Sequence, residues 1–384
     1  MSELRYFLDA GKAPDVAGLL RVRAFGRPYA PFHDPYQRYY VESLRLYCAE
    51  AGADFRSLPM SRFARPLELL KRVRDEGYAK RLRLPRGEAL VDALARVLEG
   101  RVLTPSGHFH NVTGQYLALL PEGSLRRFAI DAQDSHELAS EELRAWSDVY
   151  FKTNYWPDAG YPAKVAPLVN GDPFVLPSLE SLRSRRGTAK RVDVSFVVRV
   201  WGGADEVEGI EHTLRLLEAV NRARCTKRLL AVVVAGDVPK IRRRLERAGI
   251  ESTTRAIGAA ELWRAAAESR LNIFRLGLHY CVPWRMTGSL AIGSCIVLDR
   301  APFSVWPEPL REGVNFLSLG TDVGPGRPVA SEEQYDAVPA RIEEWLAQPS
   351  LAAEVGSANA SYFEASLAPP RVGQHIVESI VAAG

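Results

Sequence analysis

Cysteine is scarce and scattered in this 384-residue chain, whose four cysteines (Cys48, Cys225, Cys281 and Cys295) form no CxxC pair. Their spacing predicts neither a zinc site nor a disulfide framework. No apolar run is as long as a membrane span, and the N-terminal stretch MSELRYFLDAGK lacks the apolar core of a signal peptide. The sequence therefore predicts a cytoplasmic protein.

Net charge is also small, because 50 lysines and arginines stand against 46 aspartates and glutamates, which leaves +4. Arginine far outnumbers lysine, and the stretch KIRRRLERAG (240–249) could present a basic face to the phosphates of DNA. This stretch and the residue after it carry a narrow apolar stripe, Ile241, Leu245 and Ile250. A solvated helix packed on a sheet is therefore the alternative to DNA binding, which so modest a net charge does not favour.

The second half of the chain alternates apolar runs with helical patterns. VDVSFVVRV (192–200) is a continuous, mostly β-branched run, typical of a strand buried on both faces. Further apolar runs follow, with helical patterns or short loops between them, at 229–237, 271–277, 295–299 and 314–320. Strands that alternate with helices over short connections predict a parallel α/β sheet with helices on both faces, which is a Rossmann-like domain.

The first half is less regular and predicts a second α/β domain. Strands are expected at 18–26, 125–131 and 148–155, and helices at 34–52 and 86–100. Between the halves, residues 171–191 mix Pro, Ser, Gly and charge, which is typical of a linker. We expect an N-terminal domain, a linker, a C-terminal domain and a final helix, with the bounds 1–175, 176–190, 191–365 and 366–384.

The stretch GLHYCVPWRMTGSLAIGSCIVLD (277–299) follows one predicted strand, and a second Gly-containing loop follows the strand at 192–200. Ligands of open parallel sheets bind beyond the carboxyl ends of the strands, and arginine beside a helix N-terminus suits phosphate. We expect six residues of these loops to hold a phosphate-bearing ligand: Arg199, Gly203, His279, Arg285, Thr287 and Gly288. The alternative is that the arginines are solvated loop residues and His279 a structural histidine.

The order of a strand followed by G-x(7)-R-x(4)-LA-x-G-S-C-I-V resembles the donor-binding half of GT-B glycosyltransferases. The exostosin-like and spore-coat-protein-like groups are the most similar. The matching residues are Arg285, Leu290, Ala291, Gly293, Cys295 and Val297. In the first half, RFAIDAQDS (127–135) and SDVYFKTNYWPDAGYPAKVAPLVNG (147–171) resemble the acceptor-domain segment of the same enzymes. The resemblance spans roughly residues 100 to 320.

This resemblance implies two Rossmann-like domains facing across a cleft, with a C-terminal helix that crosses back to the first domain. The second domain would bind a nucleotide-sugar as co-substrate, with no further cofactor, and the first domain would bind the acceptor, a small molecule or glycan. The sequence has no Asp-x-Asp motif, so the resemblance implies metal-independent sugar transfer to a hydroxyl or amine.

One departure from the family leaves other functions open. Retaining members usually carry two glutamates near this helix, and the aligned positions here are Tyr280 and Gly288. The donor could be held differently, or the protein could be a catalytically silent nucleotide- or sugar-binding protein. Another nucleotide-sugar enzyme on this fold, an epimerase or a hydrolase, is the third alternative.

An inverting enzyme needs a general base within hydrogen-bond reach of the attacking hydroxyl. The candidates in the first half are His108 and His110 of the loop SGHFHNVTG (106–114), Asp131, which ends a strand, Asp134 and His136. Lys152 and Tyr155 could line the cleft, but a solvated lysine and a packed tyrosine are the alternatives. The two loop histidines could also bind a metal, but the sequence shows no third ligand. Asp131 could instead cap the following helix.

Overall fold

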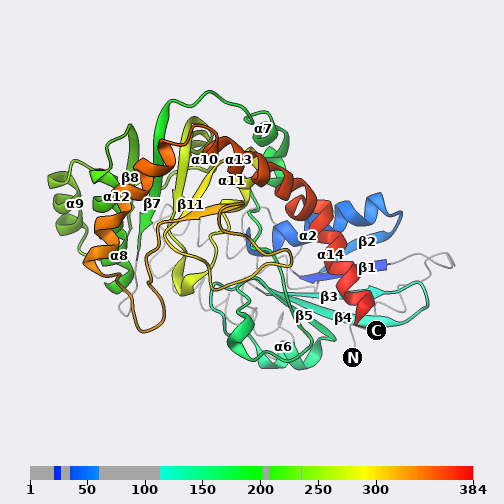
Figure 1. The fold of residues 1–384 in the computed structure, drawn as a ribbon. Coiled ribbons are helices and arrows are strands. Elements are labelled where there is room, and N and C mark those ends of the chain that lie inside the picture. The colour runs from blue at the N-terminus through cyan, green and yellow to red at the C-terminus, as the bar shows by residue number, and fades with distance from the viewer. Residues whose placement is uncertain (1–20, 27–34, 60–112, 202–206, 235, 384) are drawn as a thin grey trace, which may run out of the picture.

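The structure, a computed structural model, describes residues 21–26, 35–59, 113–201, 207–234 and 236–383. It contains two six-stranded sheets, one from each half of the chain (Figure 1). This arrangement confirms the predicted α/β class with two Rossmann-like units. No helix in the described part of the chain is long and apolar enough to cross a membrane.

The second sheet is parallel throughout, with the order β12-β11-β10-β7-β8-β9. If β7 is numbered as strand 1 and the sheet is followed from its β9 edge, the order is 3-2-1-4-5-6, which is that of a Rossmann fold. Its strands are β7 (Val192–Val200), β8 (Lys227–Val233), β9 (Glu251–Thr253), β10 (Ser269–Phe274), β11 (Ile296–Leu298) and β12 (Phe316–Ser318). Its helices are α8 (Val207–Arg222), α9 (Val238–Arg247), α10 (Ala259–Glu268), α11 (Met286–Ile292), α12 (Glu332–Leu346) and α13 (Leu351–Tyr362).

Helices cover both faces of this sheet, as the continuous apolar strands predict. Alternate residues of β11 show the two layers. Val297 belongs to the buried cluster that includes residues of α8, α9 and α12, whereas Ile296 and Leu298 belong to the cluster that includes residues of α10 and α11. The arginine-rich stretch forms α9, and its Ile241 and Leu245 are buried in the first of these layers. Its apolar stripe therefore packs on the sheet, as the second interpretation of that stretch expects.

The first sheet is mixed, with the order β2-β1-β3-β4-β5-β6. Strand β3 runs antiparallel to both of its neighbours, and the other pairs are parallel. The strands are β1 (Arg21–Gly26), β2 (Asp54–Pro59), β3 (Thr113–Leu119), β4 (Leu125–Asp131), β5 (Val149–Lys152) and β6 (Val165–Pro167). In the described part of this domain the α-helices are α2 (Pro35–Glu50) and α6 (Glu141–Trp146), and α7 (Leu179–Arg183) lies between the two sheets in sequence.

The C-terminal helix α14 (Pro369–Ala382) returns to the first domain and lies along α2 (Figure 1). Gly373 permits the close approach, since a Cβ there would lie 2.2 Å from the Ser43 carbonyl oxygen. A π-helical segment, Phe363–Leu367, joins α13 to α14. The predicted crossing-back of the C-terminal helix is therefore confirmed.

The carboxyl ends of β4 and β5 in the first sheet meet the carboxyl end of β10 in the second. Asn154, which follows β5, donates its side-chain amide to the carbonyl of His279, 3.1 Å away in the loop after β10. Asn170, which follows β6, donates to the Val282 carbonyl of the same loop at 3.0 Å. Parallel sheets bind ligands in the loops beyond the carboxyl ends of their strands. In this protein such loops of both sheets lie at one domain junction.

Candidate active site

The site begins at the topological switch point of the second sheet. From β7 the chain proceeds through β8 and β9 to one side, then crosses to β10 on the other side. Residues that follow β7 and β10 therefore lie beside the crevice in which parallel sheets bind ligands. Arg199 is the penultimate residue of β7, and Arg285 ends the loop that follows β10.

Arg199 and Arg285 form a pair of like charges at this switch point. The Arg199 side chain is exposed, whereas Arg285 is half-buried at the N-cap of α11, which confirms that it begins a helix. Burial and, second, the charge of Arg199 lower the pKa of Arg285. Within the described residues neither arginine forms an ion pair with a carboxylate. Two neighbouring guanidinium groups without a paired anion are suited to bind one.

Aromatic side chains lie beside this arginine pair. The Arg285 guanidinium carbon is 5.3 Å from the centre of the Trp284 ring, a cation–π contact. The Trp284 ring lies 5.8 Å from that of Phe174, and Phe174 and Trp201 are among the exposed large apolar residues. Flat, exposed rings next to paired cations can hold a group that combines an aromatic base with phosphates.

A buried carboxyl group, Asp172, also faces Arg285. Burial raises the pKa of Asp172 to about 7, while a hydrogen bond from the Phe174 N–H and the positive charge of Arg285 act in the opposite direction. A carboxyl group that is only partly ionised at neutral pH cannot fully neutralise Arg285. The arginine pair therefore keeps excess positive charge near pH 7.

On the side of the first domain, Asp134 faces the loop that Arg285 ends. Its carboxylate hydrogen-bonds with the Cys281 thiol of that loop. Burial raises the pKa of Asp134, against the effects of this hydrogen bond and of the nearby Lys152. A partly exposed carboxylate with a raised pKa at a domain junction has the properties of a general base.

Asp131, the strand-end carboxylate predicted as a base, has a different position and this prediction is corrected. It is fully buried, and its oxygens accept from the Tyr150 hydroxyl at 2.7 Å and from the backbone N–H groups of Gln133 and Ala139. The Lys152 ammonium lies 3.2 Å away, also fully buried. With both oxygens occupied inside the core, Asp131 is placed to hold Lys152 and the turn that carries Asp134.

Two of the residues predicted to contact the donor, Thr287 and Gly288, have packing contacts in the structure. Thr287 is fully buried, and its hydroxyl donates to the Asn170 carbonyl of the first domain at 3.0 Å. Gly288 lies against Trp263 of α10, where a Cβ would come within 2.2 Å of the indole nitrogen. Both residues fix α11 against its surroundings, and their contact with a donor stays a prediction.

His279 has an exposed side chain and an unusual backbone. It has a φ of 52° and is followed by Tyr280 with a φ of 59°, so two consecutive non-glycine residues adopt the left-handed region. Such a conformation persists only where the surroundings impose it, and the contacts of this turn include the Asn154 hydrogen bond and a backbone hydrogen bond from the Tyr280 N–H to the Gly277 carbonyl. His108, His110 and Gly203 lie outside the described residues, so their predicted roles stay predictions.

Sequence reasoning missed a buried polar network behind the site. Asp299, which follows β11, pairs with Arg300 at 2.8 Å and accepts a hydrogen bond from His212 at 3.0 Å. Burial lowers the pKa of His212, so the ring is neutral and its other nitrogen accepts from the Tyr335 hydroxyl at 2.7 Å. Arg300 and His212 outweigh burial and hold the pKa of Asp299 at about 2.

Arg300 connects this network to the domain junction. Its guanidinium carbon is 4.9 Å from the centre of the Tyr280 ring. Tyr280 in turn lies near Phe303 and Trp156, with ring centres 5.6 and 6.2 Å away. The position where the family resemblance implies a glutamate is therefore occupied by a ring that covers a buried cation. The only sequence signal for this network was the strand-ending Asp299.

Comparison with known proteins adds likenesses of fold. No family model matches the chain, and no curated protein matches it. Among solved structures, Anabaena HepE in complex with UDP-glucose aligns with 12% identity and a TM-score of 0.43, over 94% of this chain and 100% of that one. The same protein with UDP and glucose gives a TM-score of 0.41 at 12% identity, over 93% and 98% of the two chains.

An E. coli structure described as trehalose-6-phosphate bound with UDP-2-fluoro glucose aligns with 12% identity and a TM-score of 0.34. It covers 56% of this chain and 52% of that one. At such identities these likenesses concern the path of the chain and define no family.

Proposed function

We propose that this protein transfers a sugar from a nucleoside diphosphate-sugar to an acceptor hydroxyl or amine. The observation that carries the proposal is the arginine pair, Arg199 and Arg285, at the switch point of a parallel Rossmann sheet and without a paired carboxylate in the described part of the chain. The sequence resemblance to the donor-binding half of GT-B glycosyltransferases includes one of these two residues, Arg285.

On the donor side, the two arginines would bind the diphosphate. A leaving nucleoside diphosphate gains negative charge as its bond to the sugar breaks, and fixed cations stabilise that charge without a metal ion. Trp284 and Phe174 lie beside Arg285, where the planar base or the apolar face of the sugar can stack. We expect transfer to proceed without an added divalent cation.

On the acceptor side, Asp134 would accept the proton of the attacking group. The acceptor oxygen or nitrogen forms a bond to the anomeric carbon, the bond from that carbon to the diphosphate oxygen breaks, and the proton passes to the Asp134 carboxylate. The nucleoside diphosphate leaves with the bonding electron pair. A single displacement of this kind inverts the configuration at the anomeric carbon.

The first test is binding of nucleoside diphosphates. Melting temperatures would be measured with UDP, GDP, TDP and ADP, since a ligand that binds only the folded state stabilises it by mass action. A rise with at least one of them is expected, and no rise with any would contradict the proposal. Donor turnover with and without acceptor would then separate a transferase from a hydrolase.

A silent nucleotide-binding protein is the second candidate. It is favoured by Tyr280 and Gly288, which stand where the resemblance implies carboxylates and which instead cover Arg300 and pack on Trp263. This candidate expects the same rise in melting temperature but no turnover of any nucleotide-sugar, whether or not an acceptor is present.

A further inference from the structure

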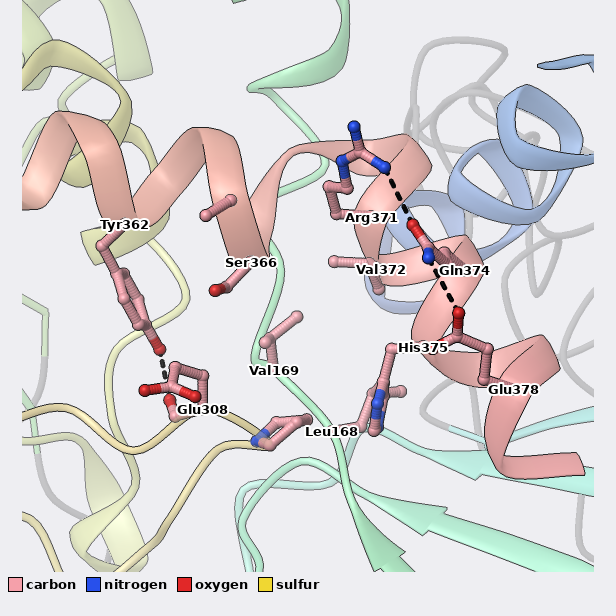
Figure 2. A pocket seen from close by; sticks show the side chains of 12 residues that line it. Leu168, Val169, Glu308, Tyr362, Ser366, Arg371, Val372, Gln374, His375 and Glu378 are labelled. Carbon is pink, nitrogen blue, oxygen red and sulfur yellow. Dashed lines mark hydrogen bonds between the residues drawn. The ribbon is translucent and has the colours of Figure 1, made fainter. Parts of the chain in front are cut away.

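A groove of about 300 Å³ lies where the C-terminal helix meets both domains, and we call it the C-terminal groove. Its walls come from three parts of the fold: Leu168 and Val169 after β6, Pro307 and Glu308 after β11, and the π-helical segment with α14. Figure 2 shows Ser366, His375 and Glu378 around it. Its volume is at the lower end of those of small-molecule sites, about 300–1,000 Å³, and suits one or two sugar rings.

Charge in the C-terminal groove disfavours anionic ligands. Glu308 and Glu378 contribute two negative charges and Arg371 one positive charge. Burial lowers the pKa of His375, so its ring adds no charge at neutral pH. The net negative charge distinguishes this groove from the arginine pair at the switch point, because a phosphate would be repelled here.

Polar groups in the groove are arranged to hydrogen-bond with hydroxyls. Gln374 accepts from Arg371 at 2.9 Å and donates to Glu378 at 2.8 Å, which fixes one oxygen of that carboxylate and leaves the other open (Figure 2). Within the described residues, the Ser366 hydroxyl and the Glu308 carboxylate have no hydrogen-bond partner. Carboxylates, an amide and a hydroxyl together offer acceptors and donors to vicinal hydroxyl groups.

The floor of the groove is apolar. Leu168 and Val372 are buried core residues that line it, beside Val169, and the C–H face of a sugar ring can pack on such a surface. The π-helical segment Phe363–Leu367 turns Ser366 toward the groove (Figure 2). Single π-helical turns occur frequently at functional sites, because they reorient side chains that a regular helix would point elsewhere.

We propose that the C-terminal groove binds a neutral saccharide unit, at a site separate from the nucleotide site. The ligand would contact both domains and the returning helix at once, so its binding would also fix their relative positions. The proposal does not depend on the transfer reaction, since a silent nucleotide-binding protein could carry the same groove.

The test uses the full-length protein and saturation-transfer NMR. The probes are glucose, galactose, mannose, N-acetylglucosamine, maltose and cellobiose, with glucose 6-phosphate as the anionic probe. Ala365 lines the groove and is exposed, so Ala365→Trp should fill the groove without disturbing the core. Ala353, an exposed alanine of α13 outside the groove, gives the matched control Ala353→Trp.

We expect at least one neutral saccharide to bind with millimolar affinity, and Ala365→Trp to weaken this binding about tenfold or more. Ala353→Trp and Arg285→Ala should leave saccharide binding unchanged, whereas Arg285→Ala should weaken the binding of nucleoside diphosphates. Glu378→Ala is the second variant, in case Ala365→Trp does not fold, and should also weaken saccharide binding. The proposal is overturned if no neutral saccharide binds, if both groove variants bind as the wild type does, or if glucose 6-phosphate binds more tightly.

Discussion

The Asn154 side chain of the first domain and the His279 carbonyl of the second are joined by a hydrogen bond of 3.1 Å across the domain junction. The same amide nitrogen donates to the Asp134 carbonyl, and its oxygen accepts from the Trp156 indole at 3.0 Å. One buried side chain therefore holds the turn of the candidate base and the left-handed loop that leads to Arg285.

Replacing Asn154 with alanine should affect both stability and activity. The variant leaves buried partners unsatisfied, which typically costs about 1–3 kcal/mol in the free energy of unfolding. Asn221→Ala is the matched control, because Asn221 donates at 2.7 Å to the Ala248 carbonyl within the second domain. We expect kcat/KM to fall more in Asn154→Ala than in Asn221→Ala at equal loss of stability. Equal activities would show that the junction contact has no part in positioning the site.

Arg285→Ala should weaken nucleoside diphosphate binding with little change in the melting temperature. A charge-assisted hydrogen bond contributes about 1.5–3 kcal/mol, so the dissociation constant should rise about tenfold to a hundredfold or more. Arg285→Lys should recover only part of the affinity, since an ammonium lacks the planar fork of donors. The measurement is a titration by calorimetry, repeated at several salt concentrations.

The matched control is Arg264→Ala, which removes an exposed arginine of α10. It should bind nucleoside diphosphates as the wild type does. Wild-type affinity in Arg285→Ala would refute the diphosphate role, and loss of the folded state would assign Arg285 to structure. Arg199→Ala should have an effect similar to Arg285→Ala if the two arginines act as a pair.

Asp134→Asn should lower kcat by about 10²- to 10⁴-fold, the usual contribution of a general base. In the wild type the base must be ionised, so kcat/KM should fall as the pH drops through the pKa of Asp134. Burial raises that pKa, which places the acid limb above the range of an ordinary aspartate. The variant should show no such limb, and a pH profile of residual activity parallel to that of the wild type would reject the assignment.

The control for this variant is Asp131→Asn. Asp131 pairs with the buried Lys152, and removal of one partner of a buried ion pair typically costs about 3–5 kcal/mol. Asp131→Asn should therefore lower the melting temperature strongly, whereas Asp134→Asn should not. If Asp134→Asn lowers the melting temperature strongly and Asp131→Asn does not, Asp131 is again a candidate base.

Much of the second domain followed from its sequence because its strands are buried on both faces. The strand expected at 192–200 is β7 with the same bounds, and Arg285 begins a helix as expected. The first domain was harder to predict. Strand β3 (Thr113–Leu119, TGQYLAL) mixes Gly and Gln into a short apolar run, and β6 has only three residues. Such segments become strands through their neighbours, which local patterns do not show.

The candidate site could be located from the sequence but not resolved residue by residue. The pattern placed Arg199 and Arg285 beside the same crevice, because carboxyl ends of parallel strands share one edge. The pattern could not distinguish Asp131 from Asp134. The two differ in burial, and the burial of Asp131 results from its contacts with Tyr150 and Lys152. The pattern likewise could not show that Gly288 lies against Trp263 of α10.

The pH dependence of stability provides the last prediction, through Asp172. Burial raises the pKa of this carboxyl group to about 7 in the folded state, while in the unfolded chain it is near 3.9. Between these values the folded state binds more protons than the unfolded state. The stability that the protonated group contributes is therefore fully present below about pH 4 and is lost as the pH rises to about 7. Over this range the free energy of unfolding should fall by up to about 1.4 kcal/mol per pH unit.

Asp172→Asn removes this dependence, because the amide is neutral at every pH and can still accept the hydrogen bond from the Phe174 N–H. The free energy of unfolding, measured by urea titration between about pH 4.5 and pH 8, should fall less steeply with pH in the variant than in the wild type. Asp158→Asn, at an exposed position in the turn Pro157–Ala159, is the matched control and should follow the wild-type curve. If the Asp172→Asn curve runs parallel to that of the wild type, the carboxyl group is already ionised in the folded protein. Arg285 would then have a permanent counter-ion, and the arginine pair would lose much of the excess positive charge on which diphosphate binding depends.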